Sequence, residues 1–341
     1  MAVPDFSGLR VAVVGDLIAD HYLFASPQRL SREAPVMVLS HEGEEIGAGG
    51  AANVARNLQA MGASVRCSGI VGRDANGREL LRVLESGGVD VAGAISLPNW
   101  TTPTKTRVLA AEPRRSLRQV LRIDREPKGA PSAEVVGELA RHMHSLAGEV
   151  DAIVVSDYEY GAVSGLLGEA ARDLAAAGTI VVLDPRQRVK PFAGVTAMTP
   201  NVGELSQFTG VSLEALEDPD VLAQAAMDML REIEIRWLLV TCGNRGMVLF
   251  GEGLAPAGAS VAATGAGEVT DVCGAGDTAA SVFALALAAG QSATEAMVLA
   301  NAASGVVVME HGAAVCSPDQ LAAALRMAPQ SIERMPRTKL T

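Results

Sequence analysis

The chain has 341 residues, of which 49% are hydrophobic and 3% aromatic, so Ala, Val and Leu must fill most of its core. This length favours one large domain with a modest appendage, and the composition is that of an ordinary folded α/β protein. A net charge of −11 argues against a duplex nucleic-acid partner, because such binders usually present a basic face. A local pocket of backbone amides and Arg side chains can still bind an anionic small molecule.

Cysteine spacing and apolar runs indicate a cytoplasmic chain with no membrane partner. The four cysteines are Cys67, Cys242, Cys273 and Cys316. They form no C-x-x-C pair and no zinc-type spacing, which is typical of a reducing compartment. Residues 1–10 lack an apolar signal core. The most apolar stretch, 278–309, is interrupted by Gln291, Glu295 and Asn301, so it predicts two buried helices instead of a membrane span.

The first third of the chain predicts one buried strand and a separate small sheet. Residues 9–14 form a β-branched run that ends in Gly15 and Asp16. Residues 21–45 and 100–124 alternate apolar and polar side chains, as strands with one wet face do. A helical stretch at 51–61 lies between them. We therefore expect a small antiparallel sheet built from two excursions out of the main domain.

From about residue 132 the pattern becomes regular. Helices are expected at 133–147, 165–177 and 213–233, strands at 151–158, 179–185, 195–201 and 237–243, and a hairpin-like segment at 247–253. Strands that alternate with helices predict a parallel sheet with right-handed crossovers. The polar residues 329–341 predict a frayed tail, so the expected domain is 1–330 and the tail 331–341.

The strongest local motif is DVCGAGDT at 271–278, which precedes an Ala-rich helical run. Gly274, Ala275 and Gly276 would direct backbone N–H groups at one point, with the helix dipole behind them. This arrangement suits a phosphate whose charge develops during transfer, and Asp277 beside it could accept a proton from a hydroxyl. The alternative is a tight strand-to-helix turn with Asp277 as a helix cap.

Two further motifs carry polar groups suited to hydroxyl recognition. A glycine run that includes Gly49 and Gly50 precedes Asn53, whose amide can donate to and accept from hydroxyls. Asp16 and Asp20 follow the first strand, where ligands bind in open parallel sheets. The alternatives are a flexible loop with a helix N-cap for the glycines, and ordinary turn chemistry for the carboxylates.

Two more junctions end predicted strands. Asn201 and Glu204 could reach a hydrated magnesium ion and phosphates, or could simply cap a helix. Thr241, Gly243 and Gly246 could lie along a nucleotide, or could form a simple hairpin. Taken together, these junctions share the carboxyl edge of one sheet and predict one crevice. The chain contains no G-x-x-x-x-G-K-[ST] loop, no G-x-G-x-x-G after the first strand and no G-x-S-x-G elbow.

The glycine run through Asn53 and the D-x-x-G-A-G-D element at 271–277 resemble the ribokinase-like (PfkB) carbohydrate kinases over residues 9–325. The resemblance implies a doubly wound, mainly parallel sheet with helices on both faces, and a small β-sheet lid over the sugar site. It also implies ATP and Mg²⁺ as cofactors, a K⁺-type monovalent cation, a sugar or sugar phosphate as partner, and a homodimer formed through the lid.

The resemblance also assigns roles by motif. It implies that Asp277 is the catalytic base and that Gly274, Ala275 and Gly276 form an anion hole. The implied sugar-contacting residues are Asp20, Gly49, Gly50 and Asn53, and we expect Asp16, Lys105, Arg107 and Asp157 as further substrate-binding candidates. The implied ATP-binding residues are Asn201, Glu204, Thr241, Gly243, Gly246 and Asn301. Glu204 would bind magnesium through water, and Asp271 would bind the monovalent cation with help from Gly312 and Cys316.

Within the family, the chain is similar to heptose 7-phosphate kinases, on VVGDLIADHY, LSREAPVMV, GGAANVARNL, TKTRVL, VVSDYEYG, MTPN and NAASGVVV. This likeness implies phosphorylation of the anomeric hydroxyl to a 1,7-bisphosphate by a stand-alone kinase. Tyr160, Arg186 and Cys273 stand where that subfamily usually has Lys, Lys and Thr. The loss of a cation at Tyr160 bears on the identity of the sugar.

Alternatives remain for the lid residues and for the activity. Lys105 and Arg107 could grip a substrate phosphate or could be solvated charges. The acceptor could instead be a fructose phosphate, ribose, a keto-deoxy acid or a nucleoside. A catalytically idle sugar or nucleotide sensor is a second possibility, and the missing dinucleotide fingerprint disfavours a dehydrogenase.

Overall fold

A mainly parallel sheet forms the centre of the molecule. The structure is a computed structural model, and it describes residues 1–111, 117–264, 272–310, 312, 314–327 and 332–334. The large sheet contains, in spatial order, β14 (Glu333–Arg334), β13 (Ala259–Val261), β12 (Met247–Gly251), β11 (Trp237–Thr241), β10 (Ala197–Met198), β9 (Ile180–Asp184), β8 (Ala152–Ser156), β1 (Arg10–Gly15), β4 (Ser64–Gly72) and β5 (Ala94–Leu97). Pairing is parallel from β5 through β11 and antiparallel from β11 to β14. Strand order reverses direction at β1, which makes the sheet doubly wound.

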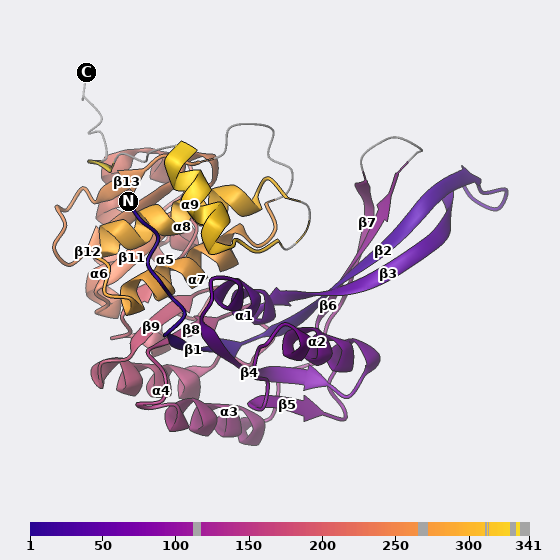
Figure 1. The fold of residues 1–341 in the computed structure, drawn as a ribbon, viewed down its shortest axis with the longest axis horizontal. Helices are drawn as coiled ribbons and strands as arrows, with labels where there is room; N and C mark the ends of the chain where they lie inside the picture. Colours follow the sequence, from indigo (N-terminus) through magenta and orange to yellow (C-terminus); the bar gives the residue numbers. More distant parts are fainter. Residues whose placement is uncertain (112–116, 265–271, 311, 313, 328–331, 335–341) are drawn as a thin grey trace.

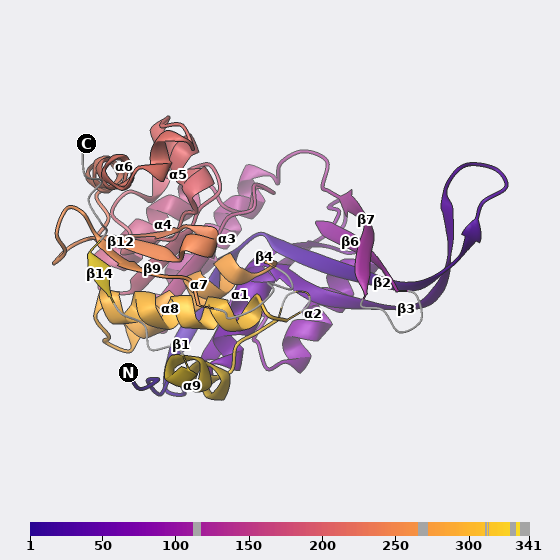
Figure 2. The same cartoon turned by 90° about the horizontal axis from the view of Figure 1, so that it is seen from above.

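Helices cover both faces of this sheet (Figures 1 and 2). One hydrophobic cluster joins the sheet to α1 (Ala51–Ala60), α2 (Ala75–Ser86), α7 (Ala275–Ala288), α8 (Ala293–Val307) and α9 (Pro318–Met327). A second cluster joins the opposite face to α3 (Ala133–Ser145), α4 (Gly165–Ala176), α5 (Val202–Thr209) and α6 (Pro219–Ile233). Short 3₁₀ turns are η1 (Lys190–Phe192), η2 (Ala215–Glu217) and η3 (Gly243–Arg245). The expected fold class is confirmed.

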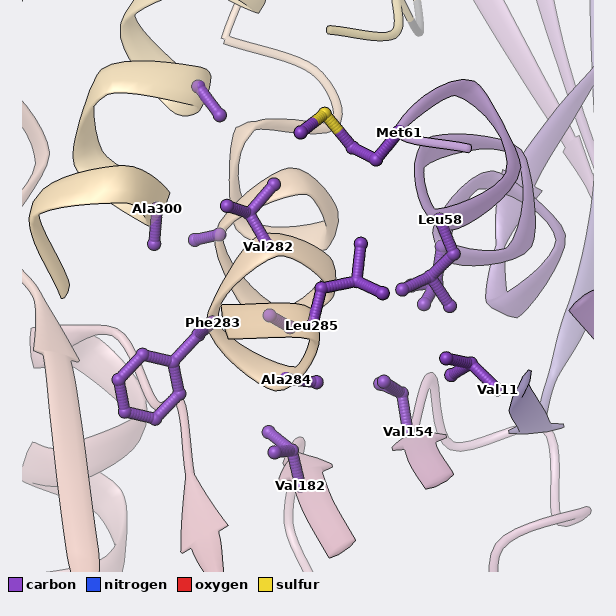
Figure 3. Packing of buried hydrophobic residues seen from close by; sticks show 14 of the residues in the cluster. Val11, Leu58, Met61, Val154, Val182, Val282, Phe283, Ala284, Leu285 and Ala300 are labelled. Carbon is purple, nitrogen blue, oxygen red and sulfur yellow. The ribbon is translucent and has the colours of Figure 1, made fainter. Parts of the chain in front are cut away.

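Helix α7 is the central packing element of the first face. Its Val282, Phe283 and Leu285 are fully buried, and Figure 3 shows them between the sheet and the neighbouring helices. A helix that is apolar on all sides is stable only when it is surrounded by protein. Burial of α7 and α8 confirms the expected pair of buried helices, and it fixes the start of α7 against the sheet.

A second sheet projects from this body (Figures 1 and 2). It contains, in spatial order, β3 (Met37–Gly50), β2 (Leu17–Leu30), β6 (Thr104–Ala110) and β7 (Arg118–Arg125). The expectation of a purely antiparallel sheet is wrong, because β2 and β6 pair in parallel. The chain returns to the body through α1, β4, α2 and β5 between β3 and β6. Strand β6 therefore leaves the body in the same direction as β2, as a crossover connection requires.

Several elements differ from the sequence-based expectations. Strands β4 and β5 and helices α2, α5 and α9 were not expected. The helix expected at 213–233 begins only at Pro219, with Asp218 as its N-cap, because Pro favours the first helical position. Within the expected tail, Glu333–Arg334 pairs with β13. Among the described residues, no helix is long and apolar enough to span a membrane.

Candidate active site

Polar side chains gather at the carboxyl edge of the parallel strands. Asp16 follows β1, Asp157 and Tyr158 follow β8, Asp184 ends β9 and Asn201 follows β10. Adjacent parallel strands end on the same side of the sheet, so these side chains surround one crevice. The N-terminus of α7 enters the same crevice, since Asp277 lines a cavity together with residues from three of these strand ends.

Asp277 lies in the first turn of α7, and its carboxylate is held from two sides. The residue is 5% exposed. Its Oδ2 accepts a hydrogen bond from Asn53 Nδ2 at 2.7 Å, and its Oδ1 accepts one from the Tyr158 hydroxyl at 2.7 Å. Helix α7 begins after Gly274, which adopts φ 79°. A carboxylate at a helix N-terminus is favoured by the helix dipole, so this position suits an ionised Asp.

Opposing effects tune the proton affinity of Asp277. Burial raises its pKa to about 6, although the hydrogen bonds from Asn53 and Tyr158 lower it. The charge of Asp20 raises the pKa further, and the charge of Lys105 lowers it. Near pH 7 the carboxylate is therefore mostly ionised yet remains a useful proton acceptor.

Two adjoining cavities meet at Gly276 and Thr241. A small cavity of about 140 Å³ is lined by Asp277, Asp184 and Glu204. A larger one of about 460 Å³ lies along the loop after β11 and α8. Gly276 and Thr241 line both cavities, so they form the boundary between the acidic pocket and the larger, more apolar groove.

The glycines of the motif have different local roles. Position 274 requires glycine, because a backbone φ of 79° is strained for residues that carry a Cβ. A Cβ added to Gly276 would meet nothing within 4 Å, so open space adjoins this residue. Of the expected anion-hole amides, that of Ala275 donates weakly to the Val272 carbonyl at 3.4 Å.

Asn201 and Glu204 form a capping box at the start of α5. Asn201 Oδ1 accepts from the Glu204 amide at 2.9 Å, and Glu204 Oε2 accepts from the Asn201 amide at 2.9 Å. Arg186 donates to the remaining oxygen of Glu204 at 3.0 Å. The capping interaction that the sequence left open is thus present, and the same side chain of Glu204 also lines the small cavity. Burial raises the pKa of Glu204.

Asp184 was not identified from the sequence, although it ends a strand that was expected. Its carboxylate accepts from the Thr199 hydroxyl at 2.9 Å and lines the small cavity. Burial raises its pKa well above the ordinary value, and the charges of Asp277 and Glu204 add to this effect. Asp157 also lines this cavity, so among the described residues four carboxylates face one positive side chain, Arg186, and a bound cation would reduce their mutual repulsion.

No three His, Cys, Asp or Glu side chains in the described part of the chain form a group that would hold a metal ion by themselves. The donors that line the small cavity are nevertheless the oxygens of Asp184 and Glu204. Such oxygens fit Mg²⁺, which is typically bound by one or two carboxylates together with water and substrate phosphates.

Asp16 holds the loop after β8. Its carboxylate accepts from the amides of Tyr158, Tyr160 and Ala162 at 2.8, 3.1 and 3.0 Å. The residue is 3% exposed, and burial raises its pKa to about 6. These contacts favour a positioning role over the direct sugar contact expected from the sequence. Asp157 is also buried and accepts from the Glu159 amide at 2.9 Å.

Asp20 and Arg107 form a buried ion pair at the base of the lid. The Arg107 guanidinium donates to Asp20 Oδ1. A Cβ at Gly49 would lie 2.8 Å from Asp20 Oδ2, and Gly50 has φ 57° with its Cβ direction blocked by the Asp16 carbonyl. The glycine run is therefore the end of β3, where it makes room for Asp20 and turns the chain into α1.

Arg107, which the sequence had marked as a candidate phosphate contact, lines a cavity under the lid together with three arginines that were not predicted. This cavity of about 700 Å³ is lined by Arg56, Arg107, Arg118 and Arg122, with Glu45 as its one lining carboxylate among the described residues. In the part of the chain that the structure describes, Arg56 and Arg118 form no ion pair. Lys105 lies in a different cavity, of about 420 Å³, with its Nζ 5.2 Å from the centre of the Tyr158 ring.

The remaining expected residues lie along the larger groove or beyond the described part. Gly243 and Gly246 adopt φ 59° and 93° in the loop after β11, and a Cβ at Gly246 would lie 2.0 Å from the Val261 carbonyl oxygen. Asn301 lines the groove and donates to the Ala262 carbonyl at 2.8 Å. The expected cation ligand Asp271 lies outside the described residues. Gly312 adopts φ 73°, and the Cys316 thiol is buried.

The sequence profile of the pfkB family carbohydrate kinases matches residues 9–320. The chain belongs to this family and is an ATP-dependent sugar kinase, a phosphotransferase with a sugar acceptor. Two solved structures share the fold. Arabidopsis thaliana ribokinase, complexed with ribose and ATP, has a TM-score of 0.69 at 22% identity and covers 96% of this chain and 100% of its own. Escherichia coli phosphofructokinase-2, in complex with potassium, has a TM-score of 0.76 at 19% identity and covers 94% and 99%.

The chain is also similar to curated proteins within this family. Bifunctional protein HldE of Citrifermentans bemidjiense is 38% identical over 319 residues, which cover 93% of this chain and 63% of that protein. The HldE of Desulfatibacillum aliphaticivorans is 37% identical, with coverage of 95% and 64%. The chain therefore spans less than two thirds of the length of these relatives.

Proposed function

We propose that the protein transfers the γ-phosphoryl group of ATP to the anomeric hydroxyl of D-glycero-D-manno-heptose 7-phosphate, giving the 1,7-bisphosphate. The observation that carries this proposal is the position of Asp277. Its buried carboxylate lies at the start of α7, where an acidic pocket adjoins a larger groove. Identity of 34–38% to HldE proteins supports the heptose phosphate as acceptor.

The two cavities suggest how ATP would lie. The nucleoside would occupy the groove of about 460 Å³ beside Gly243, Gly246 and Asn301. Its phosphates would cross the boundary at Thr241 and Gly276, where open space adjoins the glycine. Backbone N–H groups at the start of α7 would then face the γ-phosphate.

Asp184 and Glu204 would hold a magnesium ion together with the phosphates, Glu204 through water. When bound, the ion would neutralise charge on the transferred group. The capping box and Arg186 fix the orientation of Glu204 toward the pocket. Asp271 would bind a monovalent cation such as K⁺.

The transfer itself needs a proton acceptor and a fixed acceptor hydroxyl. Asp277 would take the proton from the sugar hydroxyl as its oxygen bonds to the γ-phosphorus, and the bond to the β-phosphate oxygen would break to release ADP. Asn53 would orient the Asp277 carboxylate, and Asp20 would accept from sugar hydroxyls. Positioning and fixed charges supply most of the catalysis in such reactions.

The arginine-lined cavity supports a phosphorylated acceptor. Four arginines line it on an otherwise acidic protein of net charge −11, although Arg107 pairs with Asp20 and Arg122 pairs with Asp124. Arg107 lies between this cavity and the sugar-facing Asp20, so a phosphate at the far end of a sugar could reach the other three. Arg side chains bind phosphate bidentately, and within the described residues Arg56 and Arg118 would not have to break an ion pair first.

A panel of acceptors tests this proposal. ADP release is measured with heptose 7-phosphate, the same heptose without phosphate, fructose 6-phosphate and ribose, each with ATP and Mg²⁺. We expect the highest kcat/KM with heptose 7-phosphate and a product with phosphorus at the anomeric carbon by ³¹P NMR. A higher kcat/KM with fructose 6-phosphate or ribose would contradict heptose 7-phosphate as the substrate and identify that sugar in its place. Sugar binding without ADP release for every acceptor would indicate a sensor.

A further inference from the structure

Tyr158 separates the catalytic pocket from the lid. It follows β8 and lines both the small cavity that contains Asp277 and the lid-side cavity of about 420 Å³ that contains Lys105. Nothing in the local sequence marks Tyr158 as a site residue. Its place between the two cavities puts it where an acceptor sugar would approach Asp277.

The backbone and ring of Tyr158 are fixed independently of its hydroxyl. Its amide donates to Asp16 Oδ2 at 2.8 Å. The next residue, Glu159, adopts φ 66°, a left-handed conformation that is uncommon for non-glycine residues and occurs where surrounding contacts enforce it. The Lys105 ammonium lies 5.2 Å from the ring centre, close enough for a cation–π interaction. These contacts aim the hydroxyl at Asp277.

The hydroxyl and Asn53 share the two oxygens of one carboxylate. Tyr158 donates to Oδ1 and Asn53 donates to Oδ2, each at 2.7 Å. Burial raises the pKa of Tyr158 well above its ordinary value, and the charge of Asp277 adds to this effect. Tyr158 therefore remains a donor throughout the range in which Asp277 titrates. A donor to a carboxylate stabilises the ionised form.

We propose that Tyr158 is a positioning residue for the proton acceptor: its hydroxyl orients the Asp277 carboxylate and keeps it ionised down to mildly acidic pH. This inference rests on the proposed role of Asp277. It adds a residue outside the two glycine-rich motifs to those that act on Asp277. It also predicts that the lowest pH at which the enzyme stays active depends on the hydrogen bond from Tyr158.

Other charges also face Asp277, and they would remain after the hydroxyl is removed. Asp20 on β2 and Asp184 at the end of β9 oppose its ionisation, whereas Lys105 on β6 favours it. Tyr158→Phe keeps the ring, its packing under Lys105 and the backbone bond to Asp16. A change in the titration of Asp277 in this variant therefore reports on the hydroxyl alone.

The first test is the pH dependence of kcat/KM for the sugar, measured from pH 4.5 to 8.5 in wild type, Tyr158→Phe and Tyr160→Phe. Tyr160 is a matched control because its hydroxyl bonds Glu126 at 3.4 Å, and not Asp277. In Tyr158→Phe we expect the acidic midpoint to move to higher pH by about one pH unit, with a larger loss of kcat than of nucleotide affinity. The Tyr160→Phe midpoint should match wild type. An unchanged midpoint in Tyr158→Phe would overturn the proposal.

The second test does not depend on activity. Protein labelled with ¹³C at the Asp carboxyl carbons is titrated by NMR, and the Asp277 signal is assigned by its loss in Asp277→Asn. We expect a higher titration midpoint for Asp277 in Tyr158→Phe than in wild type. The same midpoint in both proteins would refute the inference whether or not the substrate is correct. A shifted midpoint in a protein that turns over no sugar would refute the proposed function and leave the Tyr158 interaction standing.

Discussion

At the residue scale, the site depends on a balance at one carboxylate. Burial opposes the charge on Asp277, while Asn53 and Tyr158 stabilise it, and the resulting pKa of about 6 lies close to neutrality. A fully exposed Asp would be a weaker base, and a buried Asp without donors would be protonated at pH 7. The hydrogen bonds matter because they let a buried group, poorly accessible to water, remain charged.

Gly276 provides a test of where the phosphates pass. We predict that Gly276→Ala folds normally, since the new methyl group meets nothing within 4 Å. The methyl would occupy space at the boundary of the two cavities and displace the phosphates, lowering kcat/KM for ATP by about tenfold to a hundredfold. Steady-state kinetics and urea unfolding measure the two effects.

Gly137→Ala is the control for this variant. Gly137 lies in α3, outside the cavities, and an added Cβ meets only an Arg141 side-chain nitrogen at 3.5 Å. It should leave the kinetics unchanged and stabilise the helix slightly. Normal ATP kinetics in Gly276→Ala would exclude a phosphate path beside this residue.

At the element scale, helix starts at the crevice serve both folding and binding. The capping box of α5 satisfies backbone amides that would otherwise lack partners, and it also points Glu204 into the small cavity. A second capping box, Ser292 with Glu295, begins α8 on the exposed surface. The two capping boxes allow a comparison between an N-cap at the candidate active site and an N-cap far from it.

We predict that Asn201→Ala and Ser292→Ala each lower the free energy of unfolding by about 1 kcal/mol, because each removes an N-cap. Only Asn201→Ala should also lower kcat/KM for ATP, since Glu204 loses the partner that orients it. Urea titration and steady-state kinetics separate these effects. Equal kinetics in both variants would show that the α5 cap is structural alone.

The element scale also shows what local sequence could predict. The strand ends and the Gly-rich start of α7 were expected correctly, because alternation of strands with helices and a glycine before a helix are local signals. The short helix α5 was given no range of its own, although a capping role for Asn201 and Glu204 was left open, because its 8 residues fall between the strand expected at 195–201 and the helix expected at 213–233. Asp184 and Tyr158 were missed for another reason. Both are ordinary residues in the sequence, and only the pairing of β8 with β9 and the packing of α7 bring them to Asp277.

At the scale of the whole molecule, the lid ends in an exposed strand. All 8 residues of β7 are exposed, and β7 forms an edge of the four-stranded sheet. Val120, Leu121 and Ile123 are 53%, 55% and 53% exposed. An exposed apolar edge strand is a ready surface for pairing with another chain, which is consistent with the homodimer expected through the lid.

We predict a dimer in sedimentation velocity at micromolar concentration, and a monomer when Leu121 and Ile123 are both replaced by Glu. Two buried carboxylates would oppose association through this strand. Leu213→Glu is the control, because Leu213 is 56% exposed on the main body and should leave the dimer intact. A monomeric wild-type protein, or a dimer that survives both Glu substitutions, would rule out the lid interface.

The arrangement of the lid was the main error of the sequence-based expectations at this scale. Strands β2 and β6 are separated in the chain by β3, α1, β4, α2 and β5, yet they pair in parallel. Alternating side chains indicate that a segment is a strand, but they do not indicate which strand it pairs with or in which direction. The same limit applies to the arginine-lined cavity, whose arginines come from α1, β6 and β7.

The most direct measurement of the central claim is the turnover of Asp277→Asn with heptose 7-phosphate, ATP and Mg²⁺. Loss of a positioned base should lower kcat by about two to four orders of magnitude, while calorimetry finds nucleotide and sugar affinities close to those of wild type. Turnover near the wild-type rate in this variant would contradict the assignment of Asp277 as the proton acceptor.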